Sequence, residues 1–257
     1  MKPEEIAAYI GAAAWIPQII SWLYRALVKS KLLVIPNVFG EIGFTSYGPI
    51  FNVRMAFLVE NRDLIIDGLG LSIKHEDGEV RDFGWAGLGE TFSEITDASG
   101  NKQIVGKDQT PIALKVGTQS LLEKFVRFQE PRFHELDSVL TQVLITHFNF
   151  LKQRNQDSFV SEVLSSKEYF SVVTQRQNWF WWKPGRYEVT LKPSSPQTFQ
   201  LDRKSFMFEI SSAEVDLLRK NLSNIEIELK NRILSNDPNA KSEPFSWHWV
   251  NVKTLRN

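Results

Sequence analysis

The feature that most constrains this chain is an apolar stretch near its beginning, residues 6–24, which contains no charged side chain. A helix that crosses a bilayer needs about 20 apolar residues, because the hydrocarbon core is about 30 Å thick. The stretch reaches that length, but Gly11, Gln18 and Ser21 dilute its hydrophobicity. Two interpretations therefore stay open: a helix that spans a membrane, and an amphipathic helix that docks on the domain or on a partner.

Small and polar side chains recur along this stretch at intervals of three and four residues, so they share one helical face. In lipid such a face lets two helices approach closely, and in water it is the exposed side of a docked helix. We predict that this face packs against another helix. Its members are Ala7, Gly11, Ala14, Gln18 and Ser21.

The charges that flank the stretch are unequal. Arg25, Lys29 and Lys31 follow it, whereas the leading MKPEE is acidic on balance, which argues against a signal peptide. Basic flanks stay in the cytoplasm when a helix spans the membrane. A spanning helix therefore predicts an inner-membrane protein whose main domain is cytoplasmic, and a docked helix predicts a cytoplasmic protein.

The composition removes several classes of site. The chain has 30 basic and 30 acidic residues, so its charge gives no reason to expect nucleic-acid binding. It has no cysteine, which excludes disulfides, thiolate metal sites and cysteine nucleophiles. Its four histidines do not lie at the spacings of metal ligands. We therefore expect no metal and no cofactor.

Two of the histidines lie in informative surroundings. His75 directly precedes the acidic turn that contains Asp77 and Gly78, so we expect it in a solvated turn. His147 lies among apolar residues at helical spacing, so we expect it in the core with a hydrogen-bond partner.

Beyond residue 31 the hydrophobic pattern takes the period of two that is typical of strands. Residues 51–59 alternate between apolar and other side chains, and the Asp77-Gly78 pair predicts a hairpin. Pro184-Gly185, followed by Tyr187, resembles the late strand of immunoglobulin-like sandwiches, in which an early Tyr bonds back to the turn. The resemblance and the close spacing of the strands predict a mainly β fold, an immunoglobulin-like antiparallel β-sandwich.

Helical periodicity interrupts and follows these strands. Apolar spacing predicts a helical insertion over residues 132–168, and Ser211 with Glu214 forms a capping box that begins a long C-terminal amphipathic helix. Phe245, Trp247 and Trp249 alternate with other side chains, which predicts a terminal strand. The expected division is 1–31 for the N-terminal apolar helix, 32–210 for the sandwich with its insertion, and 211–257 for the C-terminal helix and terminal strand.

The most unusual feature is the aromatic run Trp179-Phe180-Trp181-Trp182. In a strand, alternate side chains point to opposite faces. We expect Phe180 and Trp182 in the core. Trp179 and Trp181, with Arg186 nearby, are then candidates to contact a ligand or a partner.

No nucleophile with a base, and no pair of carboxyls, lies at a catalytic spacing. We therefore expect a non-enzymatic binding or scaffolding module, whose ligand the sequence does not identify. Its N-terminal helix would tether it to the cytoplasmic face of a membrane or to another protein subunit, including a second copy of the chain. The alternative is a soluble hydrolase whose active site is dispersed on the sandwich, around Glu76 or His248.

Overall fold

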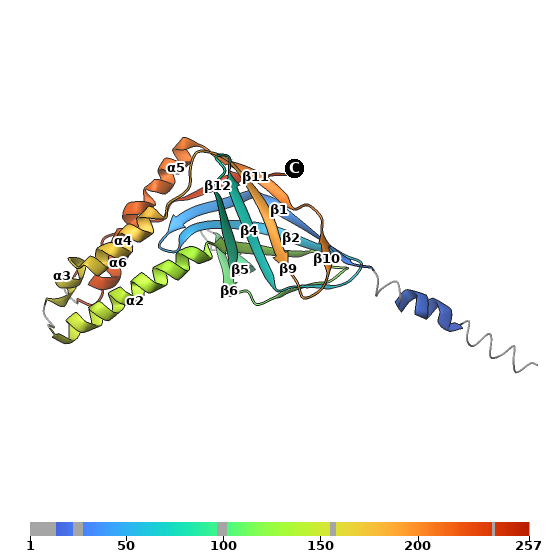
Figure 1. Cartoon of the computed structure of the whole chain (residues 1–257), viewed down its shortest axis with the longest axis horizontal. Coiled ribbons are helices and arrows are strands. Elements are labelled where there is room, and N and C mark those ends of the chain that lie inside the picture. The colour runs from blue at the N-terminus through green and yellow to red at the C-terminus, as the bar shows by residue number, and fades with distance from the viewer. Residues whose placement is uncertain (1–13, 23–27, 97–101, 155–157, 238–239, 257) are drawn as a thin grey trace, which may run out of the picture.

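A computed structural model of the chain describes residues 14–22, 28–96, 102–154, 158–237 and 240–256. The fold is mainly β, as predicted, and is built around a curled mixed sheet (Figure 1). In chain order the strands are β1 (Ser30–Thr45), β2 (Gly48–Glu60), β3 (Leu64–Ile66), β4 (Gly68–His75), β5 (Val80–Thr96), β6 (Lys102–Gln109), β7 (Leu114–Val116), β8 (Leu122–Gln129), β9 (Gly185–Ser194), β10 (Phe199–Leu201), β11 (Ser205–Ile210), β12 (Trp249–Lys253) and β13 (Leu255–Arg256). The helices named below are α2 (Pro131–Arg154), α3 (Phe159–Leu164), α4 (Lys167–Asn178), α5 (Ser212–Arg219) and α6 (Asn221–Leu234).

The C-terminal segment joins the two sides of the main sheet. The strands of the main sheet follow the order β1-β2-β8-β5-β4-β9-β11, and each neighbouring pair in this order is antiparallel. β12 pairs with β1, and β13, which follows almost directly, pairs with β11. These pairings curl one sheet around its own core, and β10 adds a short parallel strand to β1. The immunoglobulin-like sandwich is therefore not confirmed.

Aromatic side chains fill the main core. Phe51, Tyr187, Phe206 and Phe208 are buried there with stacked rings, and Trp182 donates a hydrogen bond from its indole nitrogen to the Gly43 carbonyl at 3.0 Å. Burying each large apolar side chain contributes about 1.5–3 kcal/mol. The alternation predicted for residues 51–59 is confirmed, because it is the buried face of β2.

Local turn and cap predictions are confirmed. The hairpin between β4 and β5 turns at Gly78, which has a φ of 96° that favours glycine. The Tyr187 hydroxyl accepts from the Lys183 amide at 2.7 Å and donates to the Lys183 carbonyl at 2.9 Å, so the predicted bond back to the turn is present. Ser211 and Glu214 form both bonds of the capping box.

The helices differ from their predicted bounds. The inserted helical region continues through α4 to Asn178 rather than ending at residue 168. The long C-terminal helix is two helices, α5 and α6, which meet at Lys220. The terminal strand begins only at Trp249.

Helices α2, α3, α4 and α6 form what we call the helical arm, which has its own buried core (Figure 1). The arm leaves the sheet where β8 ends, because Gln129 pairs with Ile50 near the close of the β1–β2 hairpin. The chain enters the sheet at the opposite end of β1, where Ser30 pairs with Phe199 of β10. The arm and the N-terminal segment are therefore attached to opposite ends of the sheet.

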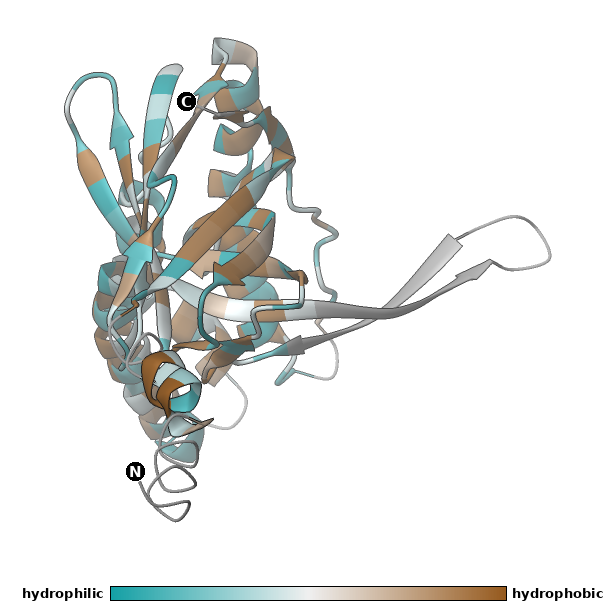
Figure 2. Cartoon of the chain, turned by 90° about the vertical axis from the view of Figure 1, so that its right-hand side faces the viewer, coloured by the Kyte–Doolittle hydropathy of each residue, from teal (hydrophilic) through white to brown (hydrophobic). Residues whose placement is uncertain are grey.

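Part of the apolar N-terminal stretch is described. Residues 14–22 are helical and exposed, including the predicted packing residues Ala14, Gln18 and Ser21, while Ala7 and Gly11 lie outside the described residues. Hydrophobic and hydrophilic residues lie on different sides of this helix (Figure 2). Among the described helices, none combines the length and the hydropathy that a membrane span requires.

Candidate functional site

Helix α2 has apolar side chains on two faces. Leu144 and Leu151 are buried in the core of the helical arm. On the outer face, apolar side chains remain exposed, with Val139 at 61% and Phe150 at 56% of their full exposure. A surface helix usually has a polar outer face, so this second apolar face lacks cover within the described chain. We call it the outer stripe, and its members are Leu136, Val139, Val143, Thr146 and Phe150.

The spacing of the outer stripe is informative. Its members follow one another at intervals of three, four, three and four residues. This is the spacing with which one helix packs along another in a coiled coil. The outer stripe is therefore shaped to receive a second helix.

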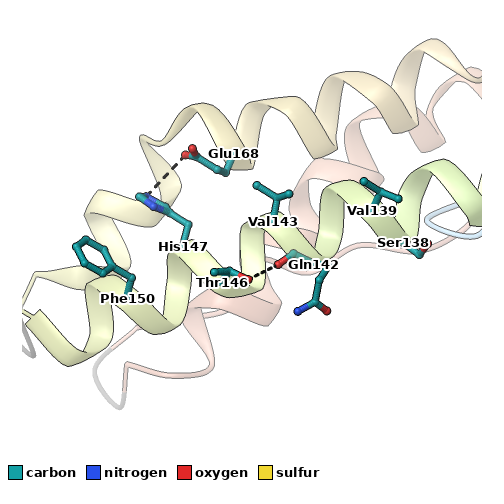
Figure 3. A pocket seen from close by; sticks show the side chains of 8 residues that line it. All are labelled: Ser138, Val139, Gln142, Val143, Thr146, His147, Phe150 and Glu168. Atoms are coloured by element: carbon teal, nitrogen blue, oxygen red, sulfur yellow. Dashed lines mark hydrogen bonds and ion pairs between the residues drawn. The ribbon is translucent and has the colours of Figure 1, made fainter.

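A cavity of about 870 Å³, which we call the outer groove, lies along this face between α2 and the beginning of α4 (Figure 3). Val139, Val143 and Phe150 supply its apolar lining. At one end the His147 ring nitrogen lies 3.7 Å from a Glu168 carboxylate oxygen, and both side chains are partly exposed. The prediction of a core histidine at position 147 is therefore wrong. The groove combines an apolar floor with one acidic group, which suits an apolar helix that carries a basic residue.

The aromatic run does not form a strand. Trp179 follows the end of α4, and the next three residues lead without strand pairing into β9. Trp181 and Trp182 are both buried, at 3% and 1% exposure, whereas Trp179 and Phe180 are half-buried. The expected alternation is therefore wrong, because Phe180 is less buried than Trp181. Trp182 lies in the core as predicted.

Glu130 holds the half-buried end of the run in place. Its carboxylate is almost fully buried and accepts a hydrogen bond from the Trp179 indole at 2.7 Å and another from Arg81 at 3.1 Å. The Arg81 guanidinium also lies over the rings of Trp179 and Trp181, at 5.5 and 5.2 Å. These contacts tie the helical arm to the sheet.

Lys183 organises a charged cluster beside this run. It donates to Asp77 at 2.7 Å and to Glu79 at 2.9 Å, and these bonds hold the pKa of both carboxyls below their ordinary values and raise the pKa of Lys183. Burial raises the pKa of the neighbouring Tyr187 to about 12. The members of the cluster satisfy one another, which favours a structural role.

His75 lies beneath this cluster and is buried, so the prediction of a solvated turn is wrong. Its ring packs on Tyr187 and its nitrogens face Asp77 at 3.0 Å and the Pro184 carbonyl at 3.2 Å. Arg186, the third predicted binding residue, is exposed, with its side chain 4.0 Å from Glu209.

Sequence reasoning missed a buried ion pair inside the helical arm. Arg176 of α4 donates two hydrogen bonds to Asp137 of α2, at 2.6 and 3.0 Å. Arg176 is 4% exposed, and a charge is buried at this depth only when it is paired. The pair fixes α2 against α4 and thereby sets the walls of the outer groove. An isolated Arg in an otherwise mixed helix gives no local signal of such a partner.

The described residues contain no cluster of three or more His, Asp or Glu side chains that could hold a metal ion. The two residues of the hydrolase alternative both contact backbone groups. The Glu76 carboxylate accepts a hydrogen bond from the Arg186 backbone amide, and the Asn221 side chain forms hydrogen bonds with the backbone amide and carbonyl of His248. Comparison of the chain with protein-family models, with curated proteins and with solved structures gives no match.

Proposed function

We propose that this chain is a non-enzymatic binding module that is tethered through its N-terminal helix to the cytoplasmic face of a membrane and that captures an amphipathic helix of a partner protein in its outer groove. The observation that carries the proposal is the outer stripe, an exposed apolar face with helix-pairing spacing on a helix whose other face is already buried. The partner helix would carry apolar residues at the same spacing and a basic residue that reaches Glu168.

The layout of the fold supports this function. The N-terminal segment joins β1 at Ser30, and the helical arm leaves from the end of the sheet at which β1 finishes. A strand of 16 residues extends over roughly 50 Å, because each residue rises about 3.3 Å. An anchor at the first end would thus present the outer groove away from the membrane surface.

The apolar area of the outer stripe predicts a modest intrinsic affinity. Its four apolar side chains are each about half exposed, so covering them yields about 1 kcal/mol each. Together these four side chains contribute a free energy that only matches the lower end of the cost of association, which is about 4–15 kcal/mol in lost translational and rotational freedom. Attachment of both proteins to one membrane would raise their effective concentration and compensate for this cost.

Photocrosslinking tests the proposal directly. A photoreactive amino acid placed at Val143 of the full chain should give one discrete adduct in source-cell membranes, and Val139→Asp should abolish it. The matched control is Ile112, which is 87% exposed and lies outside the helical arm, and which should give no adduct. Similar adducts from both positions would contradict the proposal. An adduct of twice the chain's mass would instead assign the groove to a homo-oligomer.

A further inference from the structure

A second cavity, of about 590 Å³, lies at the end of the sheet where the N-terminal segment enters. Lys29, Lys192 and Lys204 line it together with the apolar side chains of Phe199 and Leu201. We call it the basic pocket. Lys29 directly precedes Ser30, the first residue of β1, which pairs with Phe199 of β10. Figure 1 shows β10 at the end of the sheet where β1 begins. The pocket therefore lies at the root of the N-terminal segment.

Two of these lysines have no acidic partner among the residues that the structure describes. Lys192 is paired with Asp82 at 2.6 Å, and the neighbouring Lys31 lies 3.2 Å from Asp202 and 3.9 Å from Glu60. Within the described part of the chain no ion pair forms at Lys29 or Lys204, and both are exposed.

This local surplus is meaningful because the whole chain has no net charge. A lysine ammonium is a strongly hydrated point charge with three donors, which suits a phosphate oxygen. The half-buried Phe199 ring and Leu201 side chain add apolar surface beside the ammonium groups of Lys29 and Lys204. The pocket therefore offers both a binding site for an anion and a surface for the hydrocarbon next to it.

We propose that the basic pocket binds the phosphate group of an anionic phospholipid headgroup, an inference that rests on the membrane tether of the proposed function. A single weak apolar anchor gives marginal membrane binding, and stable attachment needs a second signal, for which a basic patch is sufficient. The apolar stretch of this chain is diluted by small and polar residues, so it is an anchor of the weak kind. The pocket supplies the second signal at the place where the chain would leave the membrane.

The test measures partition of the full chain onto two kinds of vesicle, phosphatidylcholine alone and phosphatidylcholine mixed with phosphatidylglycerol. Each lysine near an anionic surface contributes a factor of about five to partition, so the double variant Lys29→Gln and Lys204→Gln should bind mixed vesicles about 25-fold more weakly. Its binding to phosphatidylcholine should not change, and high salt should remove the preference of the wild type for mixed vesicles.

The matched control is the double variant Lys74→Gln and Lys220→Gln, which removes the same charge from exposed positions at the helical end of the sheet. It should partition like the wild type. The melting temperatures of both double variants should match that of the wild type, which checks that the fold is retained.

The possible results separate the two proposals. If the wild type binds both kinds of vesicle equally, the pocket inference is overturned and the tether stands. If it binds neither, the tether fails and the inference fails with it. If glycerol 3-phosphate binds through Lys29 and Lys204 while vesicle binding shows no anionic preference, the pocket serves a free phosphate compound and the lipid assignment is wrong.

Discussion

Removing the carboxylate of Asp137 should destabilise the helical arm strongly. The Arg176 side chain is 5% exposed and the Asp137 side chain 16%, so Asp137→Ala leaves a buried guanidinium whose remaining contact with Thr141 is long, at 3.3 Å. Breaking a buried ion pair by removing one partner costs about 3–5 kcal/mol. In a chain of this size each kcal/mol lowers the melting temperature by about 2–4 °C, which predicts a fall of roughly 6–20 °C.

The assay is denaturant unfolding followed by circular dichroism, with Glu135→Ala as the control because Glu135 is exposed on the same helix and should change stability by about 0.5 kcal/mol at most. Replacing the pair by apolar residues, Asp137→Leu with Arg176→Met, should recover most of the loss, since such replacements are often neutral. A loss below about 1 kcal/mol for Asp137→Ala would refute the reasoning. So would a double variant as unstable as the single one.

Two further predictions concern the region where the arm meets the sheet. Trp181→Ala and Trp182→Ala should each lower stability by about 3–5 kcal/mol in thermal or denaturant unfolding, because both indoles are buried, and a loss below about 1 kcal/mol for either would contradict this. Lys183 lowers the pKa of Asp77 and Glu79 in the folded state. The ion pairs therefore stabilise the folded state fully above the unfolded-state pKa of these carboxyls, about 4, and this stabilisation is lost as the pH falls from there through the lowered folded-state pKa values. The difference in melting temperature between the wild type and Lys183→Met should therefore be present at neutral pH and shrink below about pH 4, and a difference independent of pH would show that the charges do not cause it.

Sequence patterns predicted those features whose partners are close in the chain. The Gly78 turn, the Ser211 cap and the bond from Tyr187 to Lys183 each join residues no more than four positions apart. The buried face of β2 was also predictable, because alternation records burial along one strand.

The closure of the sheet could not be predicted in this way. β12 pairs with β1 across some two hundred residues, and neither strand's pattern specifies its partner, so close strand spacing suggested a sandwich.

The candidate site was missed for a different reason. The outer stripe shares α2 with a second apolar face that is buried, so the sequence shows one continuous helical pattern and does not reveal which side is covered. His147 illustrates the ambiguity, because it lines the outer groove with Val143 and Phe150, whereas Leu144, three positions before it, lies in the core of the helical arm. Trp181 shows the converse, since the tertiary path after α4 buries a side chain that strand alternation had assigned to the surface.

The measurement that tests the central claim most directly compares Val143→Asp with Ile112→Asp for binding of the partner that crosslinks at Val143. Both positions are exposed, so neither change should alter the melting temperature appreciably. A carboxylate at position 143 would be buried against the partner helix, which should weaken binding at least about tenfold, whereas Ile112→Asp should bind like the wild type. Full binding by a folded Val143→Asp variant would contradict the assignment of the outer stripe as the binding surface.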